Sequence, residues 1–265
     1  MDSLILGRYI PGNSVIHRLD PRSKLLAMFL FILVIFWANN LLTNLILLGF
    51  TLLAITLSGV KFSYFFKGVR PMVGLILFTT AFQLFFNRQG TPLFAWGWLQ
   101  VTDTGLQQAG IVFMRFVLII FFSTLLTLTT TPLSLSDAVE SLLKPLKPLK
   151  VPVHEIGLML SLSLRFVPTL MDDTTRIMNA QKARGVEFDE GGLVQRIKAI
   201  VPILIPLFAS SFKRADALAI AMEARGYQGG DGRSKYRILN WKWQDSLVIL
   251  MMMGLGALLF FLKKS

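Results

Sequence analysis

The stretch from Leu25 to Val60 carries no charged residue and is almost entirely apolar. It is long enough for two membrane crossings, because a helix of about 20 residues spans the hydrocarbon core of a bilayer. Asn39 and Asn40 interrupt the run in its middle, as a tight turn between two helices would. In lipid, a helix satisfies all of its own backbone hydrogen bonds. The run therefore predicts a transmembrane helical hairpin.

Three further apolar segments have the length of a membrane crossing. They run from about Pro71 to Phe86, within Gly105–Thr131 and from Ser246 to Leu262. With the hairpin they predict an all-α integral membrane protein with about five transmembrane helices. Basic residues precede the first span and separate the second from the third, which places the N-terminus in the cytoplasm. Arg115 is the one ionisable residue near a span interior, and we expect it to snorkel or to lie at an interfacial helix start.

Composition agrees with a membrane protein, because 54% of the residues are hydrophobic and only 16% are charged. The net charge of +12 does not indicate a nucleic-acid partner, since long uncharged runs interrupt the basic residues. The excess instead indicates cytoplasmic loops beside an anionic bilayer surface. The chain has no cysteine, which excludes disulfides, thiolate metal ligands and a cysteine nucleophile.

Residues 132–242 lie between the fourth span and the last and are rich in Lys and Arg. They predict a cytoplasmic helical domain. Residues 1–131 before it contain the N-terminal segment and four spans, and residues 243–265 after it contain the last span. Three prolines between Lys144 and Pro152 predict a break in helical structure. The apolar stretches Ile156–Leu164 and Ala199–Phe212 are shorter than a membrane crossing, so we expect buried or interfacial helices.

One tripeptide occurs twice in this domain, as Ala183-Arg184-Gly185 and as Ala224-Arg225-Gly226. Glycine just past a helix end readily takes the left-handed conformation, and arginine in the last turn complements the helix dipole. An Arg-Gly stop is also ordinary capping that needs no function. Two copies with similar surroundings predict more, namely two helix ends directed at two similar partners.

The segments before the two copies have the spacing of long helices. An apolar stripe at helical spacing precedes the second copy, with charged residues elsewhere on the wheel. Its members are Phe208, Phe212, Ala215, Ala219 and Met222. A weaker stripe precedes the first copy, formed by Leu170, Thr174, Ile177 and Met178. The pattern predicts two long helices that pack against each other and end in Ala-Arg-Gly, whereas ordinary helices sealing the cytoplasmic side would not need matched ends.

The chain lacks the residue groups that catalysis or metal binding requires. His17 and His154 fall in cytoplasmic segments without neighbouring ligand spacing, and no Asp or Glu lies within a predicted span. No phosphate-binding loop of the G-x-x-x-x-G-K-S/T form is present. We therefore expect no catalytic residue, no metal site and no cofactor, so that any ATP-driven work depends on another polypeptide.

Several segments together carry a resemblance to a known family. They are Tyr9-Ile10-Pro11-Gly12-Asn13-Ser14, His17-Arg18-Leu19-Asp20-Pro21-Arg22-Ser23-Lys24, Leu164-Arg165-Phe166-Val167-Pro168-Thr169-Leu170, Ala180-Gln181-Lys182-Ala183-Arg184-Gly185, Arg214-Ala215-Asp216-Ala217-Leu218-Ala219 and Ala221-Met222-Glu223-Ala224-Arg225-Gly226-Tyr227. In this order and spacing, the chain resembles nearly end to end the transmembrane T component of energy-coupling factor transporters. This family serves vitamin and metal-ion uptake within the ATP-binding cassette systems.

The resemblance implies a non-catalytic scaffold in a prokaryotic cell membrane. Such a scaffold joins two cytoplasmic ABC-type ATPases, which bind the ATP, to a small membrane-embedded substrate-binding S component. It also implies that residues 132–242 form a coupling domain with two long coupling helices. Carried onto this sequence, Arg184 and Arg225 would each end a coupling helix and contact one ATPase, with Ala183, Gly185, Ala224 and Gly226 completing the two motifs.

Other readings make different predictions. A pore-forming permease subunit of another ATP-driven importer would line the substrate pathway itself and need no additional membrane-embedded binding subunit. An intramembrane enzyme or a secondary transporter would need polar groups at depth, of which the predicted spans offer almost none. A purely structural membrane anchor would not require two matched helix ends.

Overall fold

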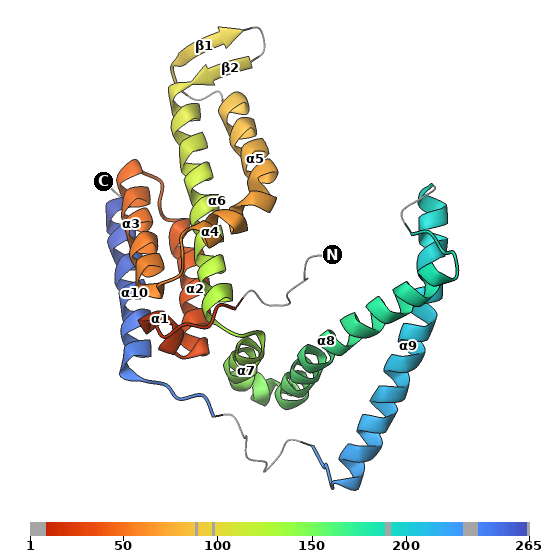
Figure 1. The fold of residues 1–265 in the computed structure, drawn as a ribbon. Coiled ribbons are helices and arrows are strands. Elements are labelled where there is room, and N and C mark those ends of the chain that lie inside the picture. The colour runs from red at the N-terminus through yellow and green to blue at the C-terminus, as the bar shows by residue number, and fades with distance from the viewer. Residues whose placement is uncertain (1–8, 88–89, 97–98, 189–191, 230–237, 264–265) are drawn as a thin grey trace. The chain divides into compact units, whose positions relative to one another are not determined.

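The computed structural model describes residues 9–87, 90–96, 99–188, 192–229 and 238–263, and helices account for most of them (Figure 1). The helices are α1 Val15–Arg18, α2 Pro21–Ile35, α3 Leu41–Ser58, α4 Ser63–Val69, α5 Val73–Phe86, α6 Asp103–Thr129, α7 Pro132–Leu143, α8 Val153–Ala183, α9 Leu193–Ala224 and α10 Trp243–Lys263, with 3₁₀ turns at Arg70–Met72 and Lys144–Leu149. The all-α prediction is confirmed.

The chain divides into two compact units. Unit 1 comprises residues 1–141 and 239–265, and unit 2 comprises residues 142–238. The structural divisions fall after residues 141 and 238, whereas the sequence predicts domain boundaries after residues 131 and 242. The difference assigns most of α7 to unit 1.

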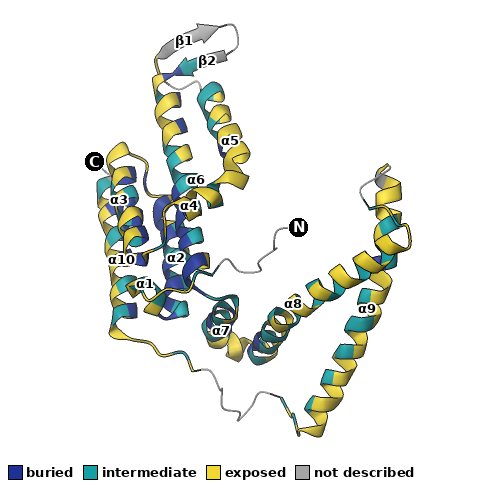
Figure 2. Cartoon of the chain, in the orientation of Figure 1, coloured by how far each residue is buried: buried dark blue, intermediate teal, exposed yellow. Residues whose placement is uncertain are grey.

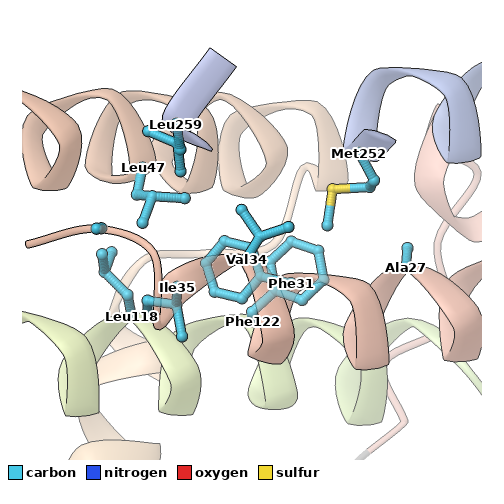
Figure 3. Close-up of a cluster of buried hydrophobic side chains, with 10 residues drawn as sticks. Ala27, Phe31, Val34, Ile35, Leu47, Leu118, Phe122, Met252 and Leu259 are labelled. Carbon is cyan, nitrogen blue, oxygen red and sulfur yellow. The ribbon is translucent and has the colours of Figure 1, made fainter. Parts of the chain in front are cut away.

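The core of unit 1 joins α2, α3, α6 and α10 (Figure 3). The rings of Phe31 and Phe122 stack with their centroids 4.3 Å apart. The buried residues of this cluster are Ala27, Phe31, Val34, Ile35, Ala38, Leu47, Leu118, Phe122, Met252 and Leu259. In a bilayer, close packing holds such helices together, because lipid tails are as apolar as the side chains themselves.

A buried carboxylate connects the start of α10 to the start of α2. Asp245 is fully buried, and its Oδ1 accepts hydrogen bonds from the Asp20 N–H at 2.8 Å and the Ser23 hydroxyl at 2.7 Å. Its Oδ2 accepts from the Lys242 N–H at 2.7 Å. This last bond reaches back over the first turn of α10 in the manner of a capping box. The helix start and the contact between helices therefore depend on one side chain.

The end of α6 lies at the same end of unit 1. Lys24 is buried in the first turn of α2, and its Nζ donates to the Thr129 carbonyl at 2.9 Å and to the Thr130 hydroxyl at 3.3 Å. Since Asp245 contacts the same turn of α2, α6 ends and α10 begins at one end of unit 1. The intervening residues must then cross a membrane an even number of times or not at all.

Among the described residues, five helical segments are long and apolar enough to span a membrane. They are Leu41–Ser58, Ser63–Phe86, Asp103–Thr129, Val194–Ala224 and Trp243–Leu262. The number of candidate spans matches the prediction, but the set of segments differs. The prediction from sequence concerned only the apolar stretch Ala199–Phe212, whereas α9 continues without interruption through Pro202 and Pro206 and is therefore long enough to qualify.

Connectivity decides whether α9 crosses the bilayer. A lone crossing by α9 would put Thr129 and Asp245 on opposite sides, yet both contact the first turn of α2. A second crossing would have to come from α8, but among the described residues α8 does not qualify as a candidate span. We infer that α9 does not span, and that α2, which has 15 residues, is the remaining crossing.

The predicted hairpin turn is confirmed between α2 and α3. The turn follows Ile35 and precedes Leu41, and α6 contacts it through Arg115. The Arg115 Nη2 donates to the Ala38 carbonyl at 3.3 Å, and the guanidinium carbon lies 5.1 Å from the centroid of the Phe36 ring. Because α6 begins at Asp103, the expectation of an interfacial helix start at Arg115 is wrong.

Two other segments differ from the prediction. The connection between α5 and α6 contains two antiparallel strands, β1 Pro92–Trp96 and β2 Leu99–Thr102, which were not predicted from the sequence. Their aromatic and β-branched residues are typical of strands. The third predicted span is also longer than expected, because α4 precedes it across the 3₁₀ turn that contains Pro71.

In unit 2, the predicted break in helical structure is confirmed. The 3₁₀ turn Lys144–Leu149 separates α7 from α8, and Lys150 follows with a φ of 61°. The long helices α8 and α9 pack against each other, as the sequence predicts. Most of their residues are nevertheless exposed or only partly buried (Figure 2).

The Asp245 contacts can be tested with Asp245→Asn. Asparagine keeps the shape but replaces one acceptor oxygen by a donor, so one buried N–H or hydroxyl loses its partner at a cost of about 1–3 kcal/mol. We expect a clearly lower thermal unfolding midpoint in detergent. The matched control is Asp103→Asn at the exposed start of α6, where about 0.3–1 kcal/mol of dipole interaction is lost. Equal midpoints for the two variants would contradict a structural role for Asp245.

Candidate functional site

The first Ala-Arg-Gly copy forms the end of α8. Arg184 is the last residue with a backbone close to helical, and Gly185 follows with a φ of 83°. The Gly185 N–H donates to the Lys182 carbonyl at 3.0 Å, and the Val186 N–H donates to the Gln181 carbonyl at 3.1 Å. These two bonds define a Schellman motif, which satisfies carbonyls that a helix end leaves without partners.

The second copy forms the end of α9 in the same way. Gly226 has a φ of 71°, and its N–H donates to the Glu223 carbonyl at 2.8 Å. The Tyr227 N–H donates to the Met222 carbonyl at 3.0 Å. Each donor and acceptor lies 41 residues after its counterpart in α8, the spacing that separates the two motifs. The prediction of two matched helix ends is confirmed.

The match extends to backbone angles. Arg184 has φ and ψ of −89° and 6°, and Arg225 has −90° and 9°. A Cβ built on Gly185 or Gly226 would meet no atom within 4 Å, so space does not require glycine at either position. The positive φ does, because L-residues other than glycine rarely adopt it.

The motif side chains are exposed at both ends, and the ends point in different directions (Figures 1 and 2). Within the described residues, neither the Arg184 nor the Arg225 guanidinium makes a hydrogen bond or ion pair. Each guanidinium therefore presents five N–H donors in a planar fork that suits a carboxylate. The arrangement has the form of two equivalent docking points.

An ion pair connects α8 and α9 at equivalent positions. The Arg214 guanidinium binds the Asp173 carboxylate, and these residues are also 41 apart. Each therefore precedes the arginine of its own helix by the same interval of about three turns, or about 16 Å. Sequence reasoning placed both residues on the helices but missed the pair, although the shared spacing was a visible signal.

The predicted stripes have different environments. Leu170, Thr174, Ile177 and Met178 of α8 are all partly buried. On α9 the partly buried positions Ser211, Arg214, Leu218 and Met222 follow one another at helical spacing. Phe208 and Phe212 lie elsewhere on the helix and are 59% and 68% exposed. Most of the apolar stripe of α9 is therefore available to something other than α8.

Unit 1 contains a cavity of about 290 Å³ between α1, α2, α3, α6 and α10. Its lining is almost entirely apolar, and the Lys24 ammonium at its edge is already bonded to α6. His17 interacts with the Ser14 hydroxyl at 2.7 Å and with the Ile10 carbonyl at 3.0 Å, which fits a local structural role. No group of three His, Cys, Asp or Glu suited to a metal ion occurs among the described residues.

Comparison with known proteins gives consistent results. The family model described as "Cobalt transport protein" matches residues 12–236. A curated relative from Streptococcus equi subsp. equi is 73% identical over 99% of this chain and 98% of its own length. Relatives from Streptococcus thermophilus and Bacillus subtilis are 66% and 52% identical over 99% of this chain and 100% and 99% of their own lengths. All three are named energy-coupling factor transporter transmembrane protein EcfT.

The helix ends can be tested by hydrogen exchange on Gly185→Val and Gly226→Val. A β-branched residue at positive φ costs on the order of 1–2 kcal/mol, so we expect the amide that follows each substitution to exchange about tenfold faster. Gly185→Asn and Gly226→Asn are the controls, because asparagine tolerates this conformation. Unchanged exchange in the valine variants would show that the motifs do not depend on the left-handed residue.

The ion pair can be tested by charge reversal. Asp173→Arg or Arg214→Asp alone places like charges together, whereas the double variant restores an opposite pair. We expect a coupling energy of about 0.5–3 kcal/mol in a double-mutant cycle of unfolding, with the double variant more stable than either single variant predicts. Lys213→Asp on the exposed side of α9 serves as the control. Strict additivity of the two single effects would exclude a direct interaction.

Proposed function

Because this chain belongs to the family of energy-coupling factor transporter transmembrane proteins, we propose that it couples two cytoplasmic ABC-type ATPases to a membrane-embedded substrate-binding S component. Vitamins or other micronutrients are the proposed cargo of the assembled importer. We further propose that the chain is non-catalytic and holds no cofactor, since the partner ATPases would bind the ATP. The chain itself is a multi-pass protein of the cell membrane.

The paired helix ends carry this proposal. Two related ATPases require two related docking points, and α8 and α9 offer the same backbone, the same exposed arginine and the same unpaired fork among the described residues. We propose that Arg184 and Arg225 each bind carboxylates of one ATPase. Lysine would replace arginine poorly there, because a point charge on a flexible stem cannot make the planar bidentate contact.

The packing of α8 against α9 offers a way to transmit the motion of the ATPases to the membrane. When ATP closes the ATPase pair, the two arginine ends would be displaced relative to each other. Each end continues into a long helix, and α8 and α9 are connected by their packing and by the Asp173–Arg214 ion pair. A relative displacement of the ends would therefore change the angle between the helices. The exposed apolar stripe around Phe208 and Phe212 is suited to hold the S component that responds.

Charge and connectivity support a cytoplasmic position for residues 132–242. Basic residues cluster at the end of unit 1 where α6 ends and α10 begins, including Arg18, Arg22 and Lys24 before and within the start of α2. The positive-inside rule assigns that end to the cytoplasm. The coupling domain and both Ala-Arg-Gly ends would then face the compartment that contains ATP.

A pore-forming permease subunit of another ATP-driven importer is the alternative. It requires a pathway for a polar substrate through this chain, but the cavity in unit 1 offers an almost entirely apolar lining. Docking on ATPases is common to both readings, so the paired arginines do not separate them. The apolar lining favours the scaffold function.

The proposal predicts that Arg184→Glu or Arg225→Glu weakens assembly with the ATPases and abolishes ATP-dependent uptake. The negative charge would repel the carboxylates that bind the native guanidinium. Co-purification with a tagged chain measures assembly, and uptake into proteoliposomes measures transport. Arg176→Glu is the matched control, because Arg176 is exposed on α8 away from its end.

We expect Arg184→Lys and Arg225→Lys to retain part of the assembly. Normal uptake in both glutamate variants would overturn the proposed function. An equal loss of assembly and uptake in the Arg176→Glu control would show that any charge reversal on these helices has this effect, wherever it lies relative to the helix ends.

A further inference from the structure

The two helix ends share their backbone but differ in charge at one equivalent position. Lys182 on α8 and Glu223 on α9 each lie two residues before the arginine, and both are exposed. Each contributes the carbonyl that accepts the hydrogen bond from the motif glycine, so their structural positions correspond. A protein surface docked over Arg184 thus meets a second positive charge, whereas one docked over Arg225 meets a negative charge.

Glu223 is not explained by the stability of its own helix. A cation in the last turn of a helix is favourable and an anion is unfavourable, because the carbonyl end carries partial negative charge. Lys182 obeys this rule, but α9 has no basic residue in its last turn and has Glu223 there. Within the described residues, Glu223 makes no ion pair that offsets the cost. The observation points to a role outside the chain.

The charges beyond the glycines strengthen the difference. Glu187 follows the first motif, and its counterpart after the second motif is the uncharged Gln228. Both are exposed. Positions 182, 184 and 187 at the first end therefore carry a positive, a positive and a negative side chain. The equivalent positions 223, 225 and 228 at the second end carry a negative, a positive and a neutral side chain. Two similar docking points with different charge order can select different partners.

We propose that Lys182 and Glu223 determine which of two different ATPases binds which helix end, an inference that rests on the proposed function. The ATPase at Arg184 would have no basic side chain facing Lys182. The ATPase at Arg225 would carry a basic side chain that pairs with Glu223, beside the carboxylates that bind the arginine. Exchange of the two ATPases would place that basic side chain against Lys182, so repulsion would exclude the reversed assembly.

Site-specific cross-linking in the full complex tests the assignment. Because the chain has no native cysteine, Asn179→Cys and Ile220→Cys each introduce a single label site. These positions are equivalent, exposed and one turn before Lys182 and Glu223. A benzophenone attached at each cysteine is photo-activated, and mass spectrometry identifies the ATPase that is captured. The measurement is repeated in the charge-exchanged variant Lys182→Glu with Glu223→Lys.

We expect each label to capture predominantly one ATPase, a different one at each end, and the exchanged variant to reduce that preference at least several-fold or to reverse it. The matched control is the double variant Lys213→Glu with Asp216→Lys, which exchanges two exposed charges of α9 away from its end. We expect this variant to leave the preference of each label for one ATPase unchanged. An unchanged preference in the Lys182 and Glu223 exchange would overturn the inference.

Two further outcomes separate this inference from the proposed function. Equal capture of both ATPases at both ends of the native chain would overturn the charge assignment while leaving ATPase coupling intact. Capture of no ATPase at either end would overturn the proposed function and the charge assignment with it.

Discussion

The carboxylate of Asp245 is the interaction on which the arrangement of unit 1 most depends. It is fully buried and accepts three hydrogen bonds, which bring the start of α10 against the first turn of α2. A buried carboxylate is stable only when its acceptor capacity is used in this way. The same turn of α2 supplies Lys24, whose ammonium donates to the last carbonyl of α6 and to the hydroxyl of Thr130. Three helix termini separated widely in sequence thus meet at one end of the bundle.

This meeting has a consequence for membrane topology that hydropathy alone does not provide. By length and composition, α9 qualifies as a span and the 15-residue α2 does not. The contacts of Thr129 and Asp245 with α2 require the intervening chain to return to the side from which it left. A count of spans that is numerically right can therefore contain a wrong member, and polar contacts at helix ends identify it.

Sequence reasoning predicted the features that local chemistry determines. The turn at Asn39 and Asn40, the break at the proline cluster and the two helix ends all follow from residues with strong backbone preferences. The length of α9 was not predictable in this way, because Pro202 and Pro206 normally argue for interruption. The strands after α5 were missed because a short apolar stretch between two spans resembles a loop. The Asp173–Arg214 pair depends on tertiary packing, and its signal lay only in the repeated spacing of 41 residues.

The prolines of α8 and α9 are unevenly placed along the two helices. Pro168 lies at the middle of α8, and Pro202 and Pro206 lie in the first half of α9. The residues beyond Pro168 and Pro206 continue without proline to the two arginines. Proline removes a backbone hydrogen bond and is the usual place where a helix bends. The helices therefore bend most easily near these prolines, far from the arginines. The segment between the last proline and the arginine of each helix moves as a rigid unit. A force applied at Arg184 or Arg225 would bend the helix at its proline and leave the geometry of the bound end intact.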